Sequence, residues 1–261
     1  MDTKKIALIT GGSRGLGKDM ALNIAKKGLG VVITYNSNKT AANDVLNEIT
    51  ALGGKVIALQ LDTRTVNSFQ DFKTNLLKEL NTEFNTNKID FLINNAGYGY
   101  NASIAETKEE DFDNLMNVHL KGVYFLTQTL LDVINDGGGI INISSGLARF
   151  SFPGYAAYAV MKGAIEVFTR YLAKELGERK IKANTIAPGA INTDFNKERF
   201  EQDPQVVDMI ASLTALGRVG ESEDIGSVVA FLCTEDANWV NGQRIEASGG
   251  MFVLRQIYLY F

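Results

Sequence analysis

Short apolar runs alternate with longer stretches of helical periodicity along almost the whole chain. Runs of this kind are typical of strands buried on both faces of a parallel sheet. They predict strands at residues 5–10, 31–34, 55–61, 89–93, 140–143, 181–186 and 243–247. Apolar residues three and four apart predict helices at residues 17–28, 38–52, 65–86, 108–135 (in two pieces), 155–178, 204–214 and 222–234.

This alternation predicts the fold class. Strand–helix–strand units form parallel sheets with right-handed crossovers, and the crossing helices cover both faces of the sheet. We therefore expect an α/β protein with a doubly wound, Rossmann-type sheet of about seven strands. No part of residues 1–261 has the composition of a linker, a repeat or a low-complexity segment, so the chain is predicted to form a single domain.

Composition narrows the functional classes. The net charge of −4 comes from dispersed charges of both signs, which offer no basic surface to nucleic acid or an anionic membrane. The single cysteine, Cys233, and the single histidine, His119, exclude a disulfide and a multi-histidine metal site and argue against a serine triad. No signal peptide and no bilayer-spanning apolar run is evident. We expect a cytoplasmic protein with no metal, nucleic-acid partner or membrane partner.

Tyr158 and Lys162 stand four residues apart within one predicted helix. This spacing places both side chains on the same helix face, one turn apart. A phenol titrates near pH ~10, and a neighbouring ammonium favours the phenolate and lowers the pKa of the phenol. The pair could therefore perform acid–base chemistry near neutral pH, although the spacing alone more often marks a solvated pair.

A glycine-rich loop lies between the first predicted strand and the first predicted helix. Gly11, Gly15 and Gly17 follow Thr10 there. Glycines allow a tight turn at this point and let the backbone approach a pyrophosphate, which then lies at the helix N-terminus. The loop predicts a dinucleotide site, with an ordinary glycine-rich turn as the alternative.

The end of the second predicted strand bears on the choice of dinucleotide. An acidic residue at this point usually binds a free ribose 2′-hydroxyl, but the strand ends in Thr34, Tyr35, Asn36 and Ser37. Arg14 in the glycine loop and Lys39 behind the strand supply cations, which suit a 2′-phosphate. NADP(H) is therefore favoured over NAD(H), unless both cations are merely solvated.

Five features occur in register along residues 5 to about 250. They are the loop Thr10–Gly17, Asn94–Gly97, Ser145, Tyr158 with Lys162, and Pro188–Gly189. In order and spacing the chain resembles the short-chain dehydrogenase/reductase family, in the single-domain branch of 3-oxoacyl-carrier-protein reductases and glucose dehydrogenases. Five matches in register are far more specific than any one of them.

The resemblance implies hydride transfer between NADP(H) and a small carbonyl or alcohol. The catalytic set would be Asn117, Ser145, Tyr158 and Lys162. Tyr158 would exchange a proton with the substrate oxygen, and Lys162 would lower the pKa of Tyr158 and bind the nicotinamide ribose. Ser145 would hold the substrate oxygen. Asn117 would complete a proton relay through water; alternatively, its side chain only forms hydrogen bonds with backbone groups of its own helix.

Two polar neighbours compete with this set. Ser144 and Ser145 are adjacent at a strand end, so only one can face the site, and the family spacing selects Ser145. His119 lies two residues from Asn117. The two side chains therefore face different ways on a helix, and we interpret His119 as structural.

Cofactor contacts follow from the resemblance in the same way. Asp62 would pair with the adenine amino group, Pro188 and Gly189 would form the wall behind the nicotinamide, and Ile191 and Thr193 would contact its carboxamide. The complete predicted set is Gly11, Ser13, Arg14, Gly15, Leu16, Gly17, Asn36, Ser37, Asp62, Thr63, Asn95, Ala96, Gly97, Tyr158, Lys162, Pro188, Gly189, Ile191 and Thr193. Asn94 is expected to tie neighbouring strands instead.

The substrate walls are expected at residues 146–154 and 192–203. Leu147, Phe150 and Phe152 in the first segment favour an apolar ketone or aldehyde, or else pack against the body of the protein. Arg149 could hold an acid group, but we interpret it as a solvated surface residue. Tyr155 is expected at the entry to the helix, near the substrate.

The C-terminal tail bears on how the protein assembles. Residues 251–261 form an apolar, aromatic tail, which predicts a subunit contact or packing across the end of the sheet, with a disordered end as the alternative. The resemblance implies a homo-oligomer, either a tetramer or a dimer, and the apolar stripe at 165–176 is the candidate surface.

The alternative function is a non-catalytic dinucleotide-binding regulator or scaffold. The glycine spacing disfavours the branch that acts on nucleotide sugars.

Overall fold

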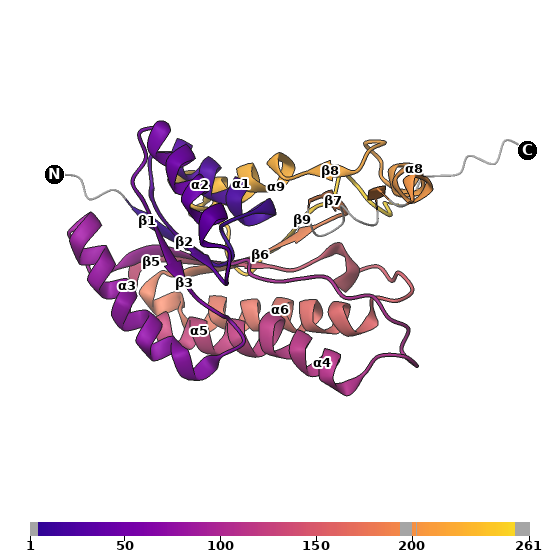
Figure 1. Ribbon diagram of the computed structural model, residues 1–261, viewed down its shortest axis with the longest axis horizontal. Coiled ribbons are helices and arrows are strands. Elements are labelled where there is room, and N and C mark those ends of the chain that lie inside the picture. The colour runs from indigo at the N-terminus through magenta and orange to yellow at the C-terminus, as the bar shows by residue number, and fades with distance from the viewer. Residues whose placement is uncertain (1–4, 194–199, 202, 254–261) are drawn as a thin grey trace, which may run out of the picture.

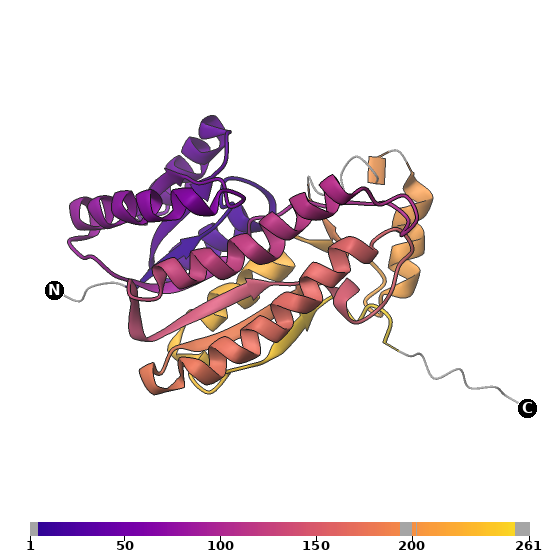
Figure 2. The ribbon, with the colours of Figure 1, turned by 90° about the horizontal axis from the view of Figure 1, so that it is seen from below.

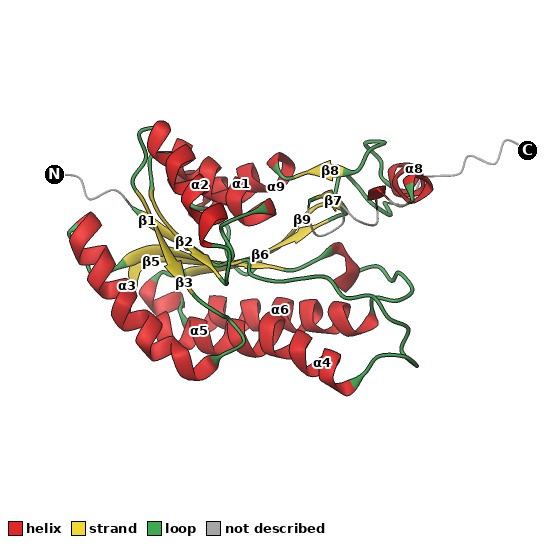
Figure 3. Ribbon diagram, in the orientation of Figure 1, coloured by secondary structure: helices red, strands yellow, loops and turns green. Residues whose placement is uncertain are grey.

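A parallel sheet forms the centre of the protein, in a computed structural model that describes residues 5–193, 200–201 and 203–253. Its seven strands have the order β3-β2-β1-β4-β5-β6-β9. They are β1 (Ile6–Ile9), β2 (Gly30–Tyr35), β3 (Val56–Gln60), β4 (Ile89–Asn94), β5 (Ile134–Ile143), β6 (Lys182–Pro188) and β9 (Arg244–Ala247). Helices cover both faces (Figures 1 and 3), so the predicted doubly wound α/β fold is confirmed.

The helices form two layers, seen from the side in Figure 1 and from below in Figure 2. One layer contains α1 (Gly15–Lys26), α2 (Lys39–Ala51) and α9 (Glu223–Leu232), and the other contains α3 (Phe69–Phe84), α4 (Glu109–Met116), α5 (Gly122–Leu130) and α6 (Ala156–Glu175). Beyond one end of the sheet lie α8 (Pro204–Leu213) and a small two-stranded sheet of β7 (Ile191–Asn192) and β8 (Gly220–Glu221).

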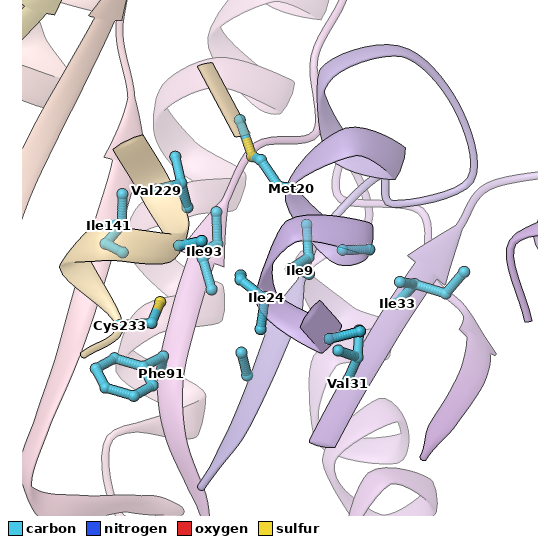
Figure 4. Close-up of a cluster of buried hydrophobic side chains, with 14 of the residues drawn as sticks. Ile9, Met20, Ile24, Val31, Ile33, Phe91, Ile93, Ile141, Val229 and Cys233 are labelled. Atoms are coloured by element: carbon cyan, nitrogen blue, oxygen red, sulfur yellow. The ribbon is translucent and has the colours of Figure 1, made fainter. Parts of the chain in front are cut away.

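Strand alternation divides the core into two hydrophobic clusters. Neighbouring side chains of a strand point to opposite faces, so Ile9 joins the cluster under α1 and α9, and Leu8 joins the cluster against α3 and α5. Figure 4 shows the first cluster, with Met20 and Ile24 of α1 and Val229 of α9 packed over the strands. Each such buried side chain contributes roughly 1.5–3 kcal/mol to folding, which makes the sheet a rigid support for the loops at its ends.

The strand order determines where a ligand can bind. The chain runs outward from β1 to β3, returns to β4 beside β1, and then continues outward in the other direction to β9. Loops after β1 and β4 therefore leave the sheet in opposite directions and open a crevice at the carboxyl ends of the strands.

The helix predicted at residues 108–135 was too long. A five-residue π-helical turn at 117–121 follows α4, α5 ends at Leu130, and β5 begins at Ile134. Inside β5 the register against β4 skips residues around Gly137 and Gly138, where an added Cβ at Gly138 would lie 2.2 Å from the Asp90 carbonyl oxygen. The apolar residues between α5 and β5 continue a helical pattern through a turn, so periodicity could not mark the end of the helix.

The apolar stripe predicted at 165–176 is not a free surface. Ile165 and Leu172 are 1% and 6% exposed and belong to the core. The outward face of α6 instead carries Val160, Val167 and Tyr171, which are 60%, 45% and 62% exposed. A helical stripe alone does not tell which apolar face of α6 meets the sheet.

Candidate active site

A cavity of about 830 Å³ opens at the carboxyl ends of the central strands, where the strand order reverses. All the cofactor-binding residues predicted from the sequence line it, and so do Ser145, Tyr158 and Lys162. Asn117 does not line it, although the next two residues, Val118 and His119, do. Asn117 begins the π-helical turn, one residue outside the cavity wall.

The glycine loop has the backbone geometry that a pyrophosphate needs. Gly11 and Gly15 have φ of +66° and +51°, a region that residues with a Cβ rarely adopt. A Cβ at Gly17 would lie 2.2 Å from the Gly11 carbonyl oxygen, so the turn can close only with glycine there. The first turn of α1 contains no acidic side chain, which leaves its N–H groups and its positive end open to an anion.

Thr10 and Asn95 fasten this loop to the end of β4. The Thr10 hydroxyl accepts hydrogen bonds from the backbone N–H groups of Asn95 (2.9 Å) and Ala96 (3.0 Å). The Asn95 side chain donates to the Thr10 carbonyl oxygen at 2.9 Å. Asn94 donates to Asn142 on β5 at 2.8 Å, which confirms that it ties neighbouring strands. Asn95 therefore lines the cavity and also holds its floor together.

The far end of the cavity is rich in amides, hydroxyls and guanidinium groups. Asn36, Ser37 and Arg14 line it, but Lys39 does not. Arg64 also lines it, a residue that the sequence analysis missed. Its guanidinium binds the Asp62 carboxylate with two nitrogens, at 3.0 and 2.6 Å, and holds the pKa of Asp62 below its usual range.

Ser144 and Ser145 point in different directions, as adjacent strand-end residues must. The Ser144 hydroxyl is buried and donates to the Glu166 carboxylate at 2.8 Å. Ser145 has an extended backbone, accepts from the Leu147 N–H at 3.2 Å, and is hydrogen-bonded to the side chain of Tyr158. Ser145 is therefore the serine that faces the Tyr158 phenol.

Tyr158 and Lys162 are both buried on α6. The Lys162 Nζ donates to the Ile143 carbonyl oxygen at 2.8 Å and lies 5.5 Å from the centroid of the Tyr158 ring. Burial raises the pKa of the Tyr158 phenol and lowers the pKa of Lys162 to about 7. The sequence predicted the opposite shift for Tyr158. For Tyr158, desolvation outweighs the opposing effect of its hydrogen bond with Ser145, so the phenol keeps its proton at neutral pH.

His119 is closer to the reaction centre than a structural interpretation implies. Its ring meets the Tyr158 ring edge-on, with centroids 5.2 Å apart, and its Nε2 lies 2.9 Å from the Tyr98 carbonyl oxygen. Burial lowers the pKa of His119 well below its usual value, so the imidazole is neutral and donates through Nε2. A Cβ at Gly97 would lie 2.5 Å from the His119 Cε1. Gly97 therefore makes room for this ring as well as for a ligand.

The other end of the cavity is apolar and aromatic. Leu147, Phe150, Phe152 and Tyr155 line it, and Tyr155 directly precedes α6 as predicted. Ile210 of α8 and Met251 also line it. These two were missed, because nothing in the local sequence links them to the other walls.

Arg149 lies outside the cavity wall, and its side chain is 41% exposed, as predicted for a surface arginine. It forms a forked ion pair with Glu246, with both distances 2.6 Å. Of the second predicted substrate segment, residues 194–199 and 202 lie outside the described residues, as do residues 254–261 of the predicted tail. Met251 at the start of the tail is buried against the end of α8, which agrees with packing across the end of the sheet.

The described part of the chain contains neither a metal-binding cluster nor a membrane-spanning helix. No group of three or more His, Cys, Asp or Glu residues there could hold a metal ion. None of the described helices is both long and apolar enough to cross a bilayer.

Comparison with known proteins agrees with this geometry. A family model described as enoyl-(acyl carrier protein) reductase matches residues 11–252. The hydroxynaphthalene reductase-like protein Arp2 of Metarhizium brunneum is 36% identical over 257 residues, which are 94% of each chain.

Two solved structures share the whole fold. The angucycline C-6 ketoreductase LanV with bound NADP has a TM-score of 0.91 at 35% identity, over 97% of this chain and 98% of LanV. The reductase LugOII, which catalyses keto-reduction at C1 during lugdunomycin biosynthesis, has a TM-score of 0.91 at 34% identity, over 96% and 99% of the two chains. Because the family model matches most of the chain and these relatives are 34–36% identical over nearly its full length, the chain belongs to the short-chain dehydrogenase/reductase family of oxidoreductases.

Proposed function

We propose that the protein is an NADPH-dependent ketoreductase, which converts a ketone to a secondary alcohol and can run in reverse. The observation that carries the proposal is the buried phenol of Tyr158, hydrogen-bonded to Ser145 and one helical turn from Lys162, in the cavity that the glycine loop also lines. NADPH supplies the hydride when it is bound, and the protein supplies orientation and a proton.

In this proposal each catalytic side chain has a separate task. Tyr158 is protonated at neutral pH, as a phenol is, and burial raises its pKa further, so it can donate to the oxygen that becomes negative during reduction. Ser145 holds that oxygen beside Tyr158. The ammonium form of Lys162 stabilises the phenolate that remains. Asn117, just outside the cavity, would pass a proton to Lys162 through water.

The preference for NADP(H) over NAD(H) rests on the far end of the cavity. Asn36 and Ser37 follow β2 without a carboxylate of their own, and Arg14 lines the same cavity. The Arg64 guanidinium is already paired with the Asp62 carboxylate. Guanidinium groups bind phosphates with paired hydrogen bonds, whereas a carboxylate would repel a 2′-phosphate. LanV, at 35% identity, has been solved with NADP.

For the substrate we propose a ketone carried on a fused, largely aromatic ring system. Phe150, Phe152, Leu147 and Tyr155 offer flat apolar surface next to Tyr158, and aromatic rings pack well against such surface. The relatives named above act, by their names, on hydroxynaphthalenes and angucyclines.

The experiment that tests the function is a panel of ketones followed by NADPH absorbance. We expect turnover of 2-tetralone with kcat/KM at least about tenfold above that of cyclohexanone, because added apolar contact in a pocket is worth about 1–3 kcal/mol. Absence of turnover with every ketone, while calorimetry shows NADPH binding, would instead favour a non-catalytic dinucleotide-binding protein.

Assembly and location are part of the same proposal. Val160, Val167 and Tyr171 of α6 are exposed apolar residues on one face, and we propose that this face joins subunits in a dimer or tetramer. Light scattering would measure the mass. The single cysteine, Cys233, is buried, which fits a reducing compartment, and we propose the cytoplasm.

A further inference from the structure

The substrate end of the cavity contains a segment far from every recognised motif. Ser248–Val253, here named the C-terminal turn, follows β9 and ends the described chain. Its residue Met251 is only 4% exposed and lines the same cavity as Tyr158 and Tyr155. A flexible thioether at this point faces the space in which the substrate rings would lie.

Backbone hydrogen bonds hold the C-terminal turn against the end of α8. The Phe252 N–H donates to the Leu213 carbonyl oxygen at 3.0 Å, and the Leu216 N–H donates to the Gly249 carbonyl oxygen at 3.1 Å. Gly249 and Gly250 have φ of +64° and +78°, and a Cβ on either would come within 2.9 Å of a side chain from residues 214–215. The approach is close enough to require glycine, so the turn is a built part of the fold.

Phe252 fastens the turn to the loop between β5 and α6. Its φ of +54° lies in the left-handed region, which is unfavourable for a bulky residue. Its ring packs on Phe150 at 4.7 Å and near Phe152 at 6.4 Å, measured between centroids. Both partners line the cavity. Phe252 therefore supports two substrate-facing rings from behind, and these contacts offset its backbone strain.

An ionic connection joins the same two segments. Arg149 binds both carboxylate oxygens of Glu246 and also donates to the Met251 carbonyl oxygen at 2.8 Å. Glu246 accepts further hydrogen bonds from Arg244 and Ser248 at 2.8 Å. Paired hydrogen bonds between a guanidinium and a carboxylate fix geometry as well as energy. In Figures 1 and 2 the C-terminal turn, the loop after β5 and α8 meet at one end of the molecule.

We propose that the C-terminal turn is the outer wall of the substrate site, that Met251 determines the size of ketone admitted, and that Glu246 and Phe252 are positioning residues. The inference rests on the proposed ketoreductase function. A substrate carbonyl at Tyr158 directs the remaining rings away from the cofactor, toward Leu147, Ile210 and Met251. Because methionine has three rotatable bonds and favourable sulfur–aromatic contacts, it can adapt to ring systems that a rigid side chain would exclude.

The test varies the volume of residue 251 and compares two ketones. Probes are 2-tetralone and its tricyclic analogue 1,2,3,4-tetrahydrophenanthren-2-one. We expect Met251→Ala to raise the tricyclic-to-bicyclic ratio of kcat/KM by about tenfold, and Met251→Trp to lower it by a similar factor. Met209→Ala is the matched control, because Met209 is an exposed methionine of α8 outside the cavity wall. It should leave the ratio unchanged.

Ketone affinity for the protein loaded with NADP⁺, measured by calorimetry, separates this inference from the reaction itself. No hydride is available in that complex, so the affinity ratio of the two ketones reports the wall alone. We expect the ratio to follow the size of residue 251. Equal changes for both ketones, or none, would overturn the role of Met251 even if turnover is robust. If no ketone of the panel is reduced, the proposed ketoreductase activity is wrong. The ratio of the two ketone affinities still decides whether the C-terminal turn forms the wall of the site.

Glu246→Gln tests the positioning role. We expect KM for the tricyclic ketone to rise about fivefold to tenfold with kcat little changed, because a loosened wall weakens binding without touching the proton donor. Asp136→Asn is the matched control, since Asp136 also pairs with an arginine but lies at the other end of β5. The positioning role of Glu246 would be overturned if kcat fell with KM unchanged, or if neither kcat nor KM changed at saturating NADPH.

Discussion

The two ends of the cavity are built in different ways. At the cofactor end, backbone geometry makes the surface: Gly11 and Gly15 have positive φ, and Gly17 can approach the Gly11 carbonyl oxygen only because it has no Cβ. At the substrate end, side chains make the surface, and they come from residues as far apart in sequence as Phe150 and Met251.

This difference explains why almost the whole cofactor end was predictable, whereas at the substrate end Leu147, Phe150 and Phe152 were predicted but Ile210 and Met251 were not. Backbone turns need particular residue types at particular spacings, so they leave a local record in the sequence. A side-chain wall needs only apolar groups of suitable shape, and many combinations satisfy that requirement. The two ends meet at Tyr158, and three experiments test how separate they are.

The largest effect is expected where the ends meet. Tyr158→Phe removes the phenol and keeps the ring that contacts His119, so turnover should fall by about 10²–10⁴-fold. NADPH affinity, measured by calorimetry, should stay close to wild type, because the glycine loop is unchanged. Tyr171→Phe on the exposed side of α6 serves as the control and should retain activity. Retained turnover in Tyr158→Phe would refute the assigned proton donor.

A smaller effect is expected at the cofactor end. Asn36→Asp places a carboxylate after β2, where it would repel a 2′-phosphate and accept from a ribose hydroxyl. The ratio of kcat/KM for NADPH over NADH should fall by about tenfold or more, which corresponds to ~1.4 kcal/mol. The ketone-size ratio should not move. Asn43→Asp on the exposed face of α2 is the control. An unchanged cofactor ratio would contradict the phosphate-binding assignment.

The smallest effect is expected at the substrate end, and it depends on pH. The hydrogen bonds from Arg149, Arg244 and Ser248 lower the pKa of Glu246 to about 2, against the opposing effect of burial, from an ordinary 4.5. A carboxyl whose pKa is depressed on folding stabilises the native state above its unfolded pKa, and this contribution is lost as pH falls toward the folded value. The contribution should therefore be complete above about pH 5 and decline toward pH 2.

Melting temperatures of wild type and Glu246→Gln measure this effect. The wild type should be more stable by about 1 kcal/mol near pH 6, because solvent screens a half-exposed pair, and the two proteins should converge below pH 3. Asp136→Asn should show a smaller difference, since its arginine pair lies at the exposed end of β5. If the melting temperatures of wild type and Glu246→Gln differ by the same amount down to pH 3, ionised Glu246 is not the source of the acid-sensitive stability.

Particular residues show how far local reasoning reached. The helix spacing put Tyr158 and Lys162 on one face, and both are indeed buried in the cavity. The pKa shift of Tyr158 was wrong because spacing reports proximity and not burial, and here burial dominates. Helical periodicity also predicted that the helix at 108–135 continues beyond Leu130, where α5 in fact ends.

His119 and Arg149 illustrate a second limit. His119 and Asn117 do face different ways, as the spacing predicted, but it is His119 that lines the cavity and contacts Tyr158, which spacing alone could not tell. Arg149 is a surface residue, as predicted, but its ion pair with Glu246 was not foreseen, because the two residues lie 97 positions apart. Both contacts involve partners that no local window contains.

By itself, the sequence determined the parallel α/β sheet, the glycine loop and the spacing of the Tyr158–Lys162 pair. Each of these depends on steric and periodic rules that act within a few residues. Only the tertiary structure decided the protonation state of Tyr158, the contact of His119 with it, and the meeting of the C-terminal turn with Phe150. These depend on burial and on contacts between residues far apart in the chain. Such contacts form only when the chain folds, and they produce no local spacing pattern in the sequence.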